Sequence, residues 1–218
     1  MIPLNDIDRR PCTFPIVTAT IIIVNAVVWL IEWVGGDAVA LRLALVPANV
    51  TAGHDLYTLL TATFAHAGWL HIIGNMIFLW AFGPEIEDVM GRARYLAFYL
   101  LCGLVAILAQ VIADPGSTAP NLGASGAIAG VMGAFLITFP RDRIRTLLII
   151  FFFVSVAYVP AILLVGLWFL IQLLSAAGSS SEGVQGGVAY LAHIGGFVFG
   201  LLAARTFEQP GRLARRCT

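Results

Sequence analysis

Charge is what this sequence lacks most. Only 11% of its 218 residues are charged, none of them is Lys, and the formal net charge is zero. Soluble domains carry about 25% charged residues, so the composition excludes an ordinary cytosolic domain. It also excludes a disordered chain and a nucleic-acid binder, because both classes need many charges. The three cysteines include no CxxC pair, so this common metal-binding motif is absent.

Long apolar runs take the place of the missing charge, and 60% of the residues are hydrophobic. A helix that crosses a bilayer needs about 20 mostly apolar residues. The sequence therefore predicts an all-α polytopic membrane protein, a single domain over residues 1–218 with six transmembrane helices. The predicted spans are residues 14–34, 68–82, 95–113, 123–139, 160–177 and 187–206.

The arginines predict the orientation of these helices, since cytoplasmic loops are enriched in Lys and Arg. Six spans with both termini in the cytoplasm place every Arg except Arg42 on the cytoplasmic side. The apolar segment 146–159 precedes the fifth span, and Pro160 is expected to interrupt the long run that the two would form. We expect this segment to dip into the inner leaflet.

Four polar residues lie inside the predicted spans at a similar depth. They are His71 and Asn75 in the second span, Ser125 in the fourth and His193 in the sixth. With the termini inside, all three spans start from the outer side, and a rise of about 1.5 Å per residue places the four side chains in the outer third to half of the bilayer. Polar groups inside a membrane are costly, so each is a candidate for function.

Glycines predict that the fourth and sixth spans lie against each other. Small residues spaced by three let helix backbones approach closely in lipid. Such pairs are Gly126 with Gly130 and Gly196 with Gly200. If these two faces meet, Ser125 and His193 come within hydrogen-bonding distance.

These residues suit acyl transfer to water. A serine hydroxyl becomes nucleophilic when a base takes its proton, and neutral His is the usual base. No Asp or Glu lies in the sixth span, so Ser125 and His193 are expected to form a dyad rather than a triad. His71, Asn75 and the backbone N–H of Ser125 are the predicted donors to the oxyanion. No metal site is predicted, because the chain has no HExxH motif and no carboxylate at this depth.

Other interpretations remain for each residue alone. Ser125 could bond a carbonyl one turn earlier in its helix, while His71, Asn75 and His193 could join helices. A transporter with a polar path is a further alternative. However, the inner halves of the second, fourth and sixth spans are almost wholly apolar, which favours a pocket that opens outward.

At these residues the chain resembles the rhomboid intramembrane serine proteases of the six-span bacterial type. The resemblance runs from about Asp55 to Gly200. Its motifs are His66-x4-His71-x3-Asn75, Gly83-x3-Glu87-x3-Gly91, Gly123-Ala124-Ser125-Gly126 and Ala192-His193-x2-Gly196-x3-Gly200.

The resemblance implies a role for each matched residue. Ser125 matches the nucleophile, His193 the general base, and His71 and Asn75 the oxyanion-hole side chains. The residues that match supporting positions are His66, Glu87, Gly126, Gly196 and Gly200.

The resemblance also implies the setting of the reaction. The expected substrates are single-span membrane proteins, cut near the outer face of the bilayer, without a cofactor. The expected location is the bacterial cytoplasmic (inner) membrane. The fifth span and the loop before the sixth resemble the family's substrate gate and cap. The alternative within the family is a catalytically silent protein that binds membrane clients, although such proteins usually lack the Ser or the His.

The chain departs from some family members at two places. Ala129 stands where some members carry a Tyr that stacks on the catalytic His. Either another aromatic residue substitutes for this Tyr, or the His is held less tightly. Tyr57 and Thr58 stand where some members carry Trp-Arg in the first loop. Neither departure removes a catalytic group.

Overall fold

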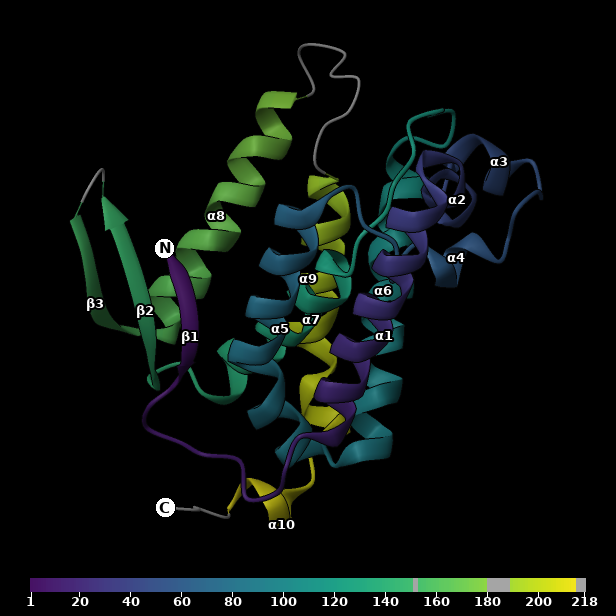
Figure 1. Cartoon of the computed structure of the whole chain (residues 1–218). Helices are drawn as coiled ribbons and strands as arrows, with labels where there is room; N and C mark the ends of the chain where they lie inside the picture. The colour runs from purple at the N-terminus through teal and green to yellow at the C-terminus, as the bar shows by residue number, and fades with distance from the viewer. Residues whose placement is uncertain (151–152, 180–188, 215–218) are drawn as a thin grey trace.

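The computed structural model describes residues 1–150, 153–179 and 189–214 as a helix bundle with a small sheet at its side (Figure 1). The helices are α1 (Ile16–Gly35), α2 (Asp37–Leu43), α3 (Pro47–Thr51), α4 (Thr58–Thr61), α5 (Trp69–Met90), α6 (Arg92–Ala113), α7 (Ser125–Thr138), α8 (Ala161–Ser179), α9 (Tyr190–Phe207) and α10 (Pro210–Leu213). The strands are β1 (Ile2–Asp6), β2 (Arg143–Ile150) and β3 (Phe153–Pro160).

The long helices agree with five predicted spans to within three residues at each end. Of the described helices, α1, α6, α8 and α9 are long and apolar enough to cross a membrane, and α7 is apolar but shorter. The count of six spans and the location of the two termini stay predictions.

The predicted second span, 68–82, ends too early. Helix α5 continues through Pro84 to Met90. Acidic residues follow Phe82, but Glu85 and Glu87 are only 5% and 3% exposed. Since bundle contacts bury these side chains, their charge does not mark the end of the helix.

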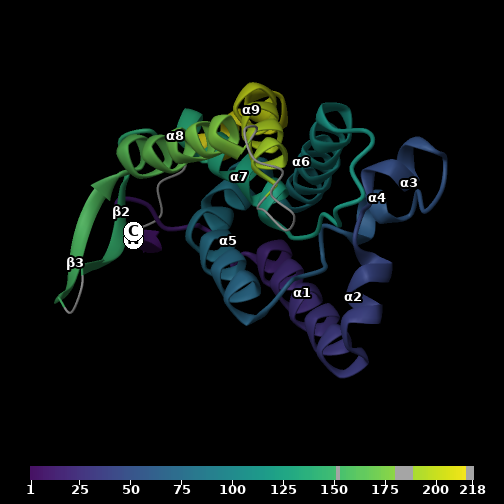
Figure 2. The ribbon, with the colours of Figure 1, turned by 90° about the horizontal axis from the view of Figure 1, so that it is seen from above.

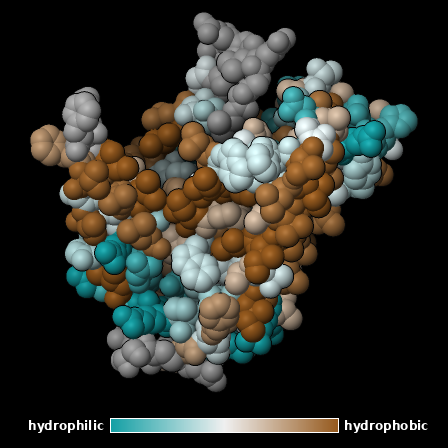
Figure 3. All heavy atoms as spheres, in the orientation of Figure 1, coloured by the Kyte–Doolittle hydropathy of each residue, from teal (hydrophilic) through white to brown (hydrophobic). Residues whose placement is uncertain are grey.

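The outer surface of the bundle is apolar. Large hydrophobic side chains such as Val34 on α1 and Leu174 on α8 are exposed. In Figure 3 hydrophobic residues cover the middle of the visible face, and hydrophilic residues gather toward its two ends. Soluble monomers rarely expose contiguous apolar patches this extensive, whereas a lipid-facing surface requires them.

Helices α7 and α9 approach each other more closely than side chains would allow. A Cβ atom built on Gly196 would overlap the carbonyl group of Gly126, and one built on Gly200 would overlap the backbone of Gly130. A Cβ on Gly133 would likewise overlap the α9 backbone. The two glycine faces recognised in the sequence therefore meet along α7, whose side chains are almost all buried.

We predict that Gly200→Ala destabilises the protein, because the new methyl group meets backbone that cannot rotate away. Overpacking of this kind costs about 1–3 kcal/mol. Thermal unfolding in detergent would measure the loss. Gly166→Ala on α8 is the matched control, since nothing lies within 4 Å of a Cβ there. Equal melting temperatures for the two variants would contradict the close contact.

The segment 146–159 belongs to a β-hairpin, so the predicted all-α class is wrong in this part of the chain. Strands β1, β2 and β3 form an antiparallel sheet in that order, with Arg143 opposite Pro160 and Ile150 opposite Phe153. The segment is rich in β-branched and aromatic residues, which favour strands. As predicted, Pro160 ends this run, and α8 begins at the next residue. The sheet lies beside α8 at the margin of the bundle (Figure 2).

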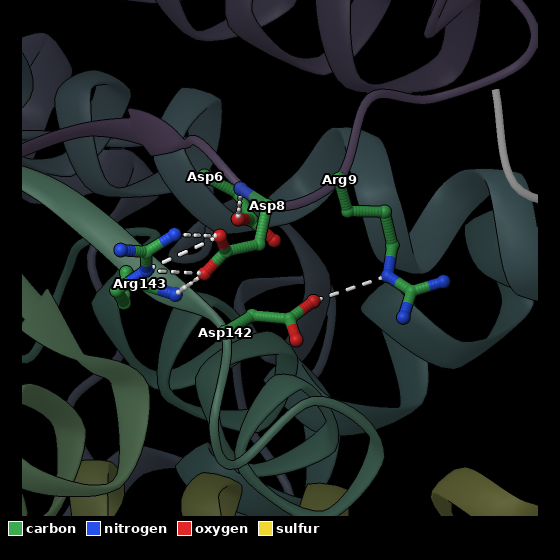
Figure 4. A network of polar contacts seen from close by, with 5 residues as sticks. All are labelled: Asp6, Asp8, Arg9, Asp142 and Arg143. Carbon is green, nitrogen blue, oxygen red and sulfur yellow. Dashed lines mark hydrogen bonds and ion pairs between the residues drawn. The ribbon is translucent and has the colours of Figure 1, made fainter. Parts of the chain in front are cut away.

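A polar network joins the chain around β1 to the start of β2 (Figure 4). The Arg143 guanidinium donates to both carboxylate oxygens of Asp8, with Nε at 3.0 Å from Oδ2. Arg9 Nε donates to Asp142 Oδ2 at 3.1 Å, and its guanidinium lies 4.1 Å from the centre of the Phe139 ring. These contacts hold the N-terminal strand against the hairpin.

Asp6 is the buried acid of this network, with 3% exposure. Burial, followed by the nearby Asp142 carboxylate, raises the pKa of Asp6 to about 7. In contrast, the hydrogen bonds from Arg143 lower the pKa of the exposed Asp8 carboxyl. The folded protein therefore favours the protonated form of Asp6.

We predict that stability falls as the pH rises from about 4, the usual pKa of Asp, toward 7. In this window the unfolded chain loses the Asp6 proton while the folded chain keeps it, and above pH 7 the effect is constant. Asp6→Asn mimics the protonated side chain, so melting temperatures from pH 4.5 to 8 should depend less on pH. The exposed control Asp114→Asn should retain the wild-type dependence. Parallel curves for wild type and Asp6→Asn would overturn the prediction.

Candidate active site

Ser125 is the first residue of α7, at the end of a segment held by backbone hydrogen bonds. Gly123 N donates to the Ala62 carbonyl oxygen at 2.8 Å, and Leu45 and Asn121 form an isolated β-bridge. The first N–H groups of a helix have no partner within it. Ser125 therefore presents its hydroxyl and its backbone N–H at a helix N-terminus.

His193 on α9 lies next to this serine. Its Nε2 atom is 2.6 Å from Ser125 Oγ, and its side chain is buried. Ser125 directly precedes Gly126, and His193 lies within one turn of Gly196. Both glycines belong to the α7–α9 contact. Because the two helices touch through backbone there, the serine and the imidazole reach each other without extended side chains.

His71 borders the same space. A Cβ on Gly123, whose φ is +126°, would lie 2.8 Å from His71 Nε2 and 3.6 Å from Ser125 Oγ. His71 Nδ1 accepts a hydrogen bond from Ala67 N at 3.4 Å. Since neutral imidazole has one donor and one acceptor, this contact puts the proton on Nε2, on the side of Gly123 and Ser125.

Asn75 is held by His66. Its Nδ2 lies 3.0 Å from His66 Nε2, and His66 Nδ1 lies 3.2 Å from the Phe64 carbonyl oxygen. A carbonyl only accepts, so His66 donates from Nδ1 and accepts from Asn75 through Nε2. Glu32 on α1 fixes the backbone of this histidine, accepting from His66 N at 3.1 Å. The sequence analysis did not single out Glu32, although a lone acid in an apolar helix is a usable signal.

Two residues on α8 complete the surroundings of His193. Gln172 Oε1 lies 2.7 Å from His193 Nδ1, and the Trp168 and His193 ring centroids are 5.8 Å apart. Trp168 is thus an aromatic neighbour of the histidine. It comes from α8, whereas the α7 position at which some family members carry a stacking Tyr is Ala129 in this chain. Gln172 was not predicted as a site residue, because nothing in the sequence shows which face of α8 meets α9.

Glu87 lies within α5 and caps α1. Its carboxylate accepts from Val17 N at 2.9 Å, from Thr18 N at 2.7 Å and from Thr18 Oγ1 at 2.8 Å. The N-cap residue of α1, Pro15, makes no side-chain capping bond. A carboxylate at a helix N-terminus satisfies free N–H groups and matches the positive end of the dipole. The site's helix α5 is thereby tied to α1.

A small cavity of about 30 Å³ lies beside Ser125, between α6, α7 and the start of α9. It is lined mainly by small residues of these helices and by Thr63 and Asn121. The space is about that of one water molecule. Among the described residues, no three His, Cys, Asp or Glu side chains gather to hold a metal ion.

The first loop positions Tyr57 and Thr58 through short hydrogen bonds. The Tyr57 hydroxyl donates to the Arg42 carbonyl oxygen at 3.0 Å, and Thr58 Oγ1 donates to the Asp55 carbonyl oxygen at 2.6 Å. Both side chains anchor their own loop, and this anchoring does not use the Trp-Arg pair of some family members.

Apolar helices surround the part-buried serine–histidine contact, as expected for a polytopic membrane protein. Comparison with known proteins is consistent with this class. Residues 53–209 match the Rhomboid domain family model. The chain therefore belongs to the rhomboid family, and it is an integral multi-pass membrane protein.

Individual relatives are similar over shorter stretches. The putative rhomboid protease YdcA of Bacillus subtilis is 31% identical over 125 residues, which cover 56% of this chain and 62% of the relative. Rhomboid protein 1, mitochondrial, of Saccharomyces cerevisiae is 31% identical over 149 residues, which cover 66% of this chain and 40% of the relative. Rhomboid protease GluP of Bacillus subtilis is 35% identical over 88 residues, covering 40% and 17%. The chain thus spans less than two thirds of the length of each of these relatives.

We predict that Glu87→Ala destabilises the protein, because it leaves the buried Thr18 N–H and the part-buried Val17 N–H of α1 without an acceptor. An unsatisfied buried group costs about 1–3 kcal/mol. Thermal unfolding would show the loss. Asp88→Ala is the matched control, because the carboxylate of this neighbouring acid accepts an exposed hydrogen bond from the Thr13 hydroxyl and caps no helix. Equal effects of the two substitutions would argue against the capping role.

Proposed function

We propose that this protein is an intramembrane serine endopeptidase that hydrolyses peptide bonds of single-span membrane proteins near the outer membrane face. One observation carries the proposal: the part-buried 2.6 Å contact between His193 Nε2 and Ser125 Oγ in an apolar bundle. Membership of the rhomboid family supports intramembrane proteolysis in general. The two relatives from Bacillus subtilis are named as proteases.

The reaction begins when His193 Nε2 takes the proton of Ser125 Oγ. The oxygen then attacks the scissile carbonyl carbon, and the carbonyl electrons move onto its oxygen. The imidazolium returns the proton to the leaving amine, which leaves an acyl-enzyme. Water, activated by the same imidazole, hydrolyses this ester and restores the serine.

The oxyanion of the tetrahedral intermediate needs donors that are already in place. His71 is aligned by Ala67 N so that its Nε2–H is on the Ser125 side, and Asn75 is held by His66 with one amide N–H to spare. The backbone N–H of Ser125 is a third donor at the positive end of α7. These three groups are the proposed oxyanion hole, and no step requires a cofactor or metal.

The site's place in the fold supports a membrane substrate. Ser125, His71 and His193 all lie in the first turn or two of their helices, which begin at the same end of the bundle. We place that end at the outer face, with six spans and both termini in the cytoplasm. The cytoplasmic membrane of a bacterium is the proposed location, and residues 1–218 form the proposed single domain.

A rhomboid-like protein that binds membrane clients without cutting them is the second candidate. The aligned Ser125–His193 contact favours the enzyme, because a binding-only role needs neither residue. A transport path is disfavoured, because α7 below its first turn is packed by glycines, alanines and large apolar side chains.

We predict that purified protein in detergent cuts a generic single-span substrate and that Ser125→Ala and His193→Ala abolish the cleavage. Loss of nucleophile or base removes the covalent route, so the rate should fall by at least about 100-fold. Product bands and mass spectrometry would measure turnover and locate the cut.

Matched controls exist for both substitutions. Ser155→Ala changes an exposed serine on β3, and His54→Ala an exposed loop histidine. Both should cut at the wild-type rate. Cleavage by folded Ser125→Ala at the wild-type rate would refute the proposed nucleophile.

A further inference from the structure

Gln172 is a buried polar residue on the packed face of α8, whose other face is apolar and exposed. It is 8% exposed, whereas neighbours such as Ile171 and Leu174 are 48% and 64% exposed. A polar side chain in an apolar setting is costly unless it is hydrogen-bonded. Its partner is therefore informative, and that partner is His193, the proposed base.

The hydrogen bonds of Gln172 fix which end of its amide faces the histidine. Its Nε2 donates to the Trp168 carbonyl oxygen at 3.5 Å, one turn earlier on α8, while its Oε1 lies 2.7 Å from His193 Nδ1. The amide oxygen thus faces His193, and an amide oxygen only accepts, so the 2.7 Å contact assigns the donor role to the histidine. His193 Nδ1 consequently carries the proton and donates it to Gln172.

This arrangement determines the tautomer of the histidine. With the proton on Nδ1, Nε2 has a free lone pair, and that lone pair is directed at Ser125 Oγ at 2.6 Å. The opposite tautomer would place a proton between the two atoms and could not accept one from the serine. Trp168, on the same helix as Gln172, also contacts the histidine: its ring is tilted by 39° against the imidazole and limits rotation of the imidazole.

Resting on the proposed function, we propose that Gln172 is a positioning residue for the reaction: its amide oxygen holds His193 in the tautomer that accepts the Ser125 proton. The working unit is then a Ser125–His193 dyad oriented by Gln172, with a neutral amide where soluble serine hydrolases carry a carboxylate. An amide orients the imidazole without placing a bare charge inside the bilayer.

The position on α8 has a consequence for the site. Among the described elements, α8 packs against α9, α7 and the hairpin but has at most marginal contact with α5 (Figure 2). Gln172, which aligns His193, therefore lies on α8, a helix that is not packed against α5. Alignment of His193 depends on α8 staying docked on α9.

We would test this with the rate at which a fluorophosphonate labels Ser125, measured from pH 5 to 9. Gln172→Leu removes the acceptor for His193 Nδ1–H and should slow labelling at least about tenfold. This loss is smaller than the roughly 10²–10⁴-fold that a general base contributes, because His193 itself is still present. Gln172→Glu keeps an acceptor and adds a charge that favours the imidazolium. It should therefore label Ser125 and move the rising limb of the profile to higher pH by about one unit.

Gln110→Leu on α6 is the matched control and should behave as wild type, because the Gln110 side-chain oxygen accepts no hydrogen bond from any described residue. A folded Gln172→Leu protein with the wild-type rate and pH profile would overturn the inference. If Gln172→Leu does not fold, the Gln172→Glu profile decides: an unshifted limb overturns the inference as well. Failure of the wild type to label at Ser125 would instead refute the proposed function itself.

Discussion

The backbone contact between α7 and α9 is the constraint on which the site depends. Gly126 and Gly130 face Gly196 and Gly200 with no room for a side chain between them. In lipid, helices gain little from hydrophobic exclusion, so close packing of small residues is a main source of affinity between them. The same contact brings the short Ser125 side chain to the His193 imidazole. Stability and the proposed chemistry are therefore set by one interface.

Around this interface each polar side chain of the site has a polar partner supplied by another part of the chain. His66 aligns Asn75, Ala67 N aligns His71, and Gln172 aligns His193. Such pairing lowers the cost of polar groups in an apolar bundle and fixes which nitrogen donates and which accepts. The proposed mechanism uses those assignments: a base with a free lone pair and donors that face the oxyanion.

Sequence alone predicted most of the helices, because apolar length and charge scarcity are strong signals in membrane proteins. The end of α5 was not predicted, because burial of Glu85 and Glu87 depends on contacts with other segments. The hairpin was not predicted either, because hydropathy alone does not distinguish an apolar strand from an apolar helix, and the β-branched residues of this run were not weighed. Of the site, the matching depth of Ser125, His71 and His193 was readable from spacing. The contacts of Glu32, Trp168 and Gln172 were not, because they depend on which face of each helix meets its neighbour.

The central claim is that His193 makes Ser125 a nucleophile inside the bundle. Its most direct test is to treat the folded protein with a fluorophosphonate and locate the adduct by peptide mass spectrometry. The account predicts a single adduct on Ser125 in the wild type and none in His193→Ala. An adduct confined to another residue, or equal labelling of Ser125 with and without the His193 imidazole, would contradict it.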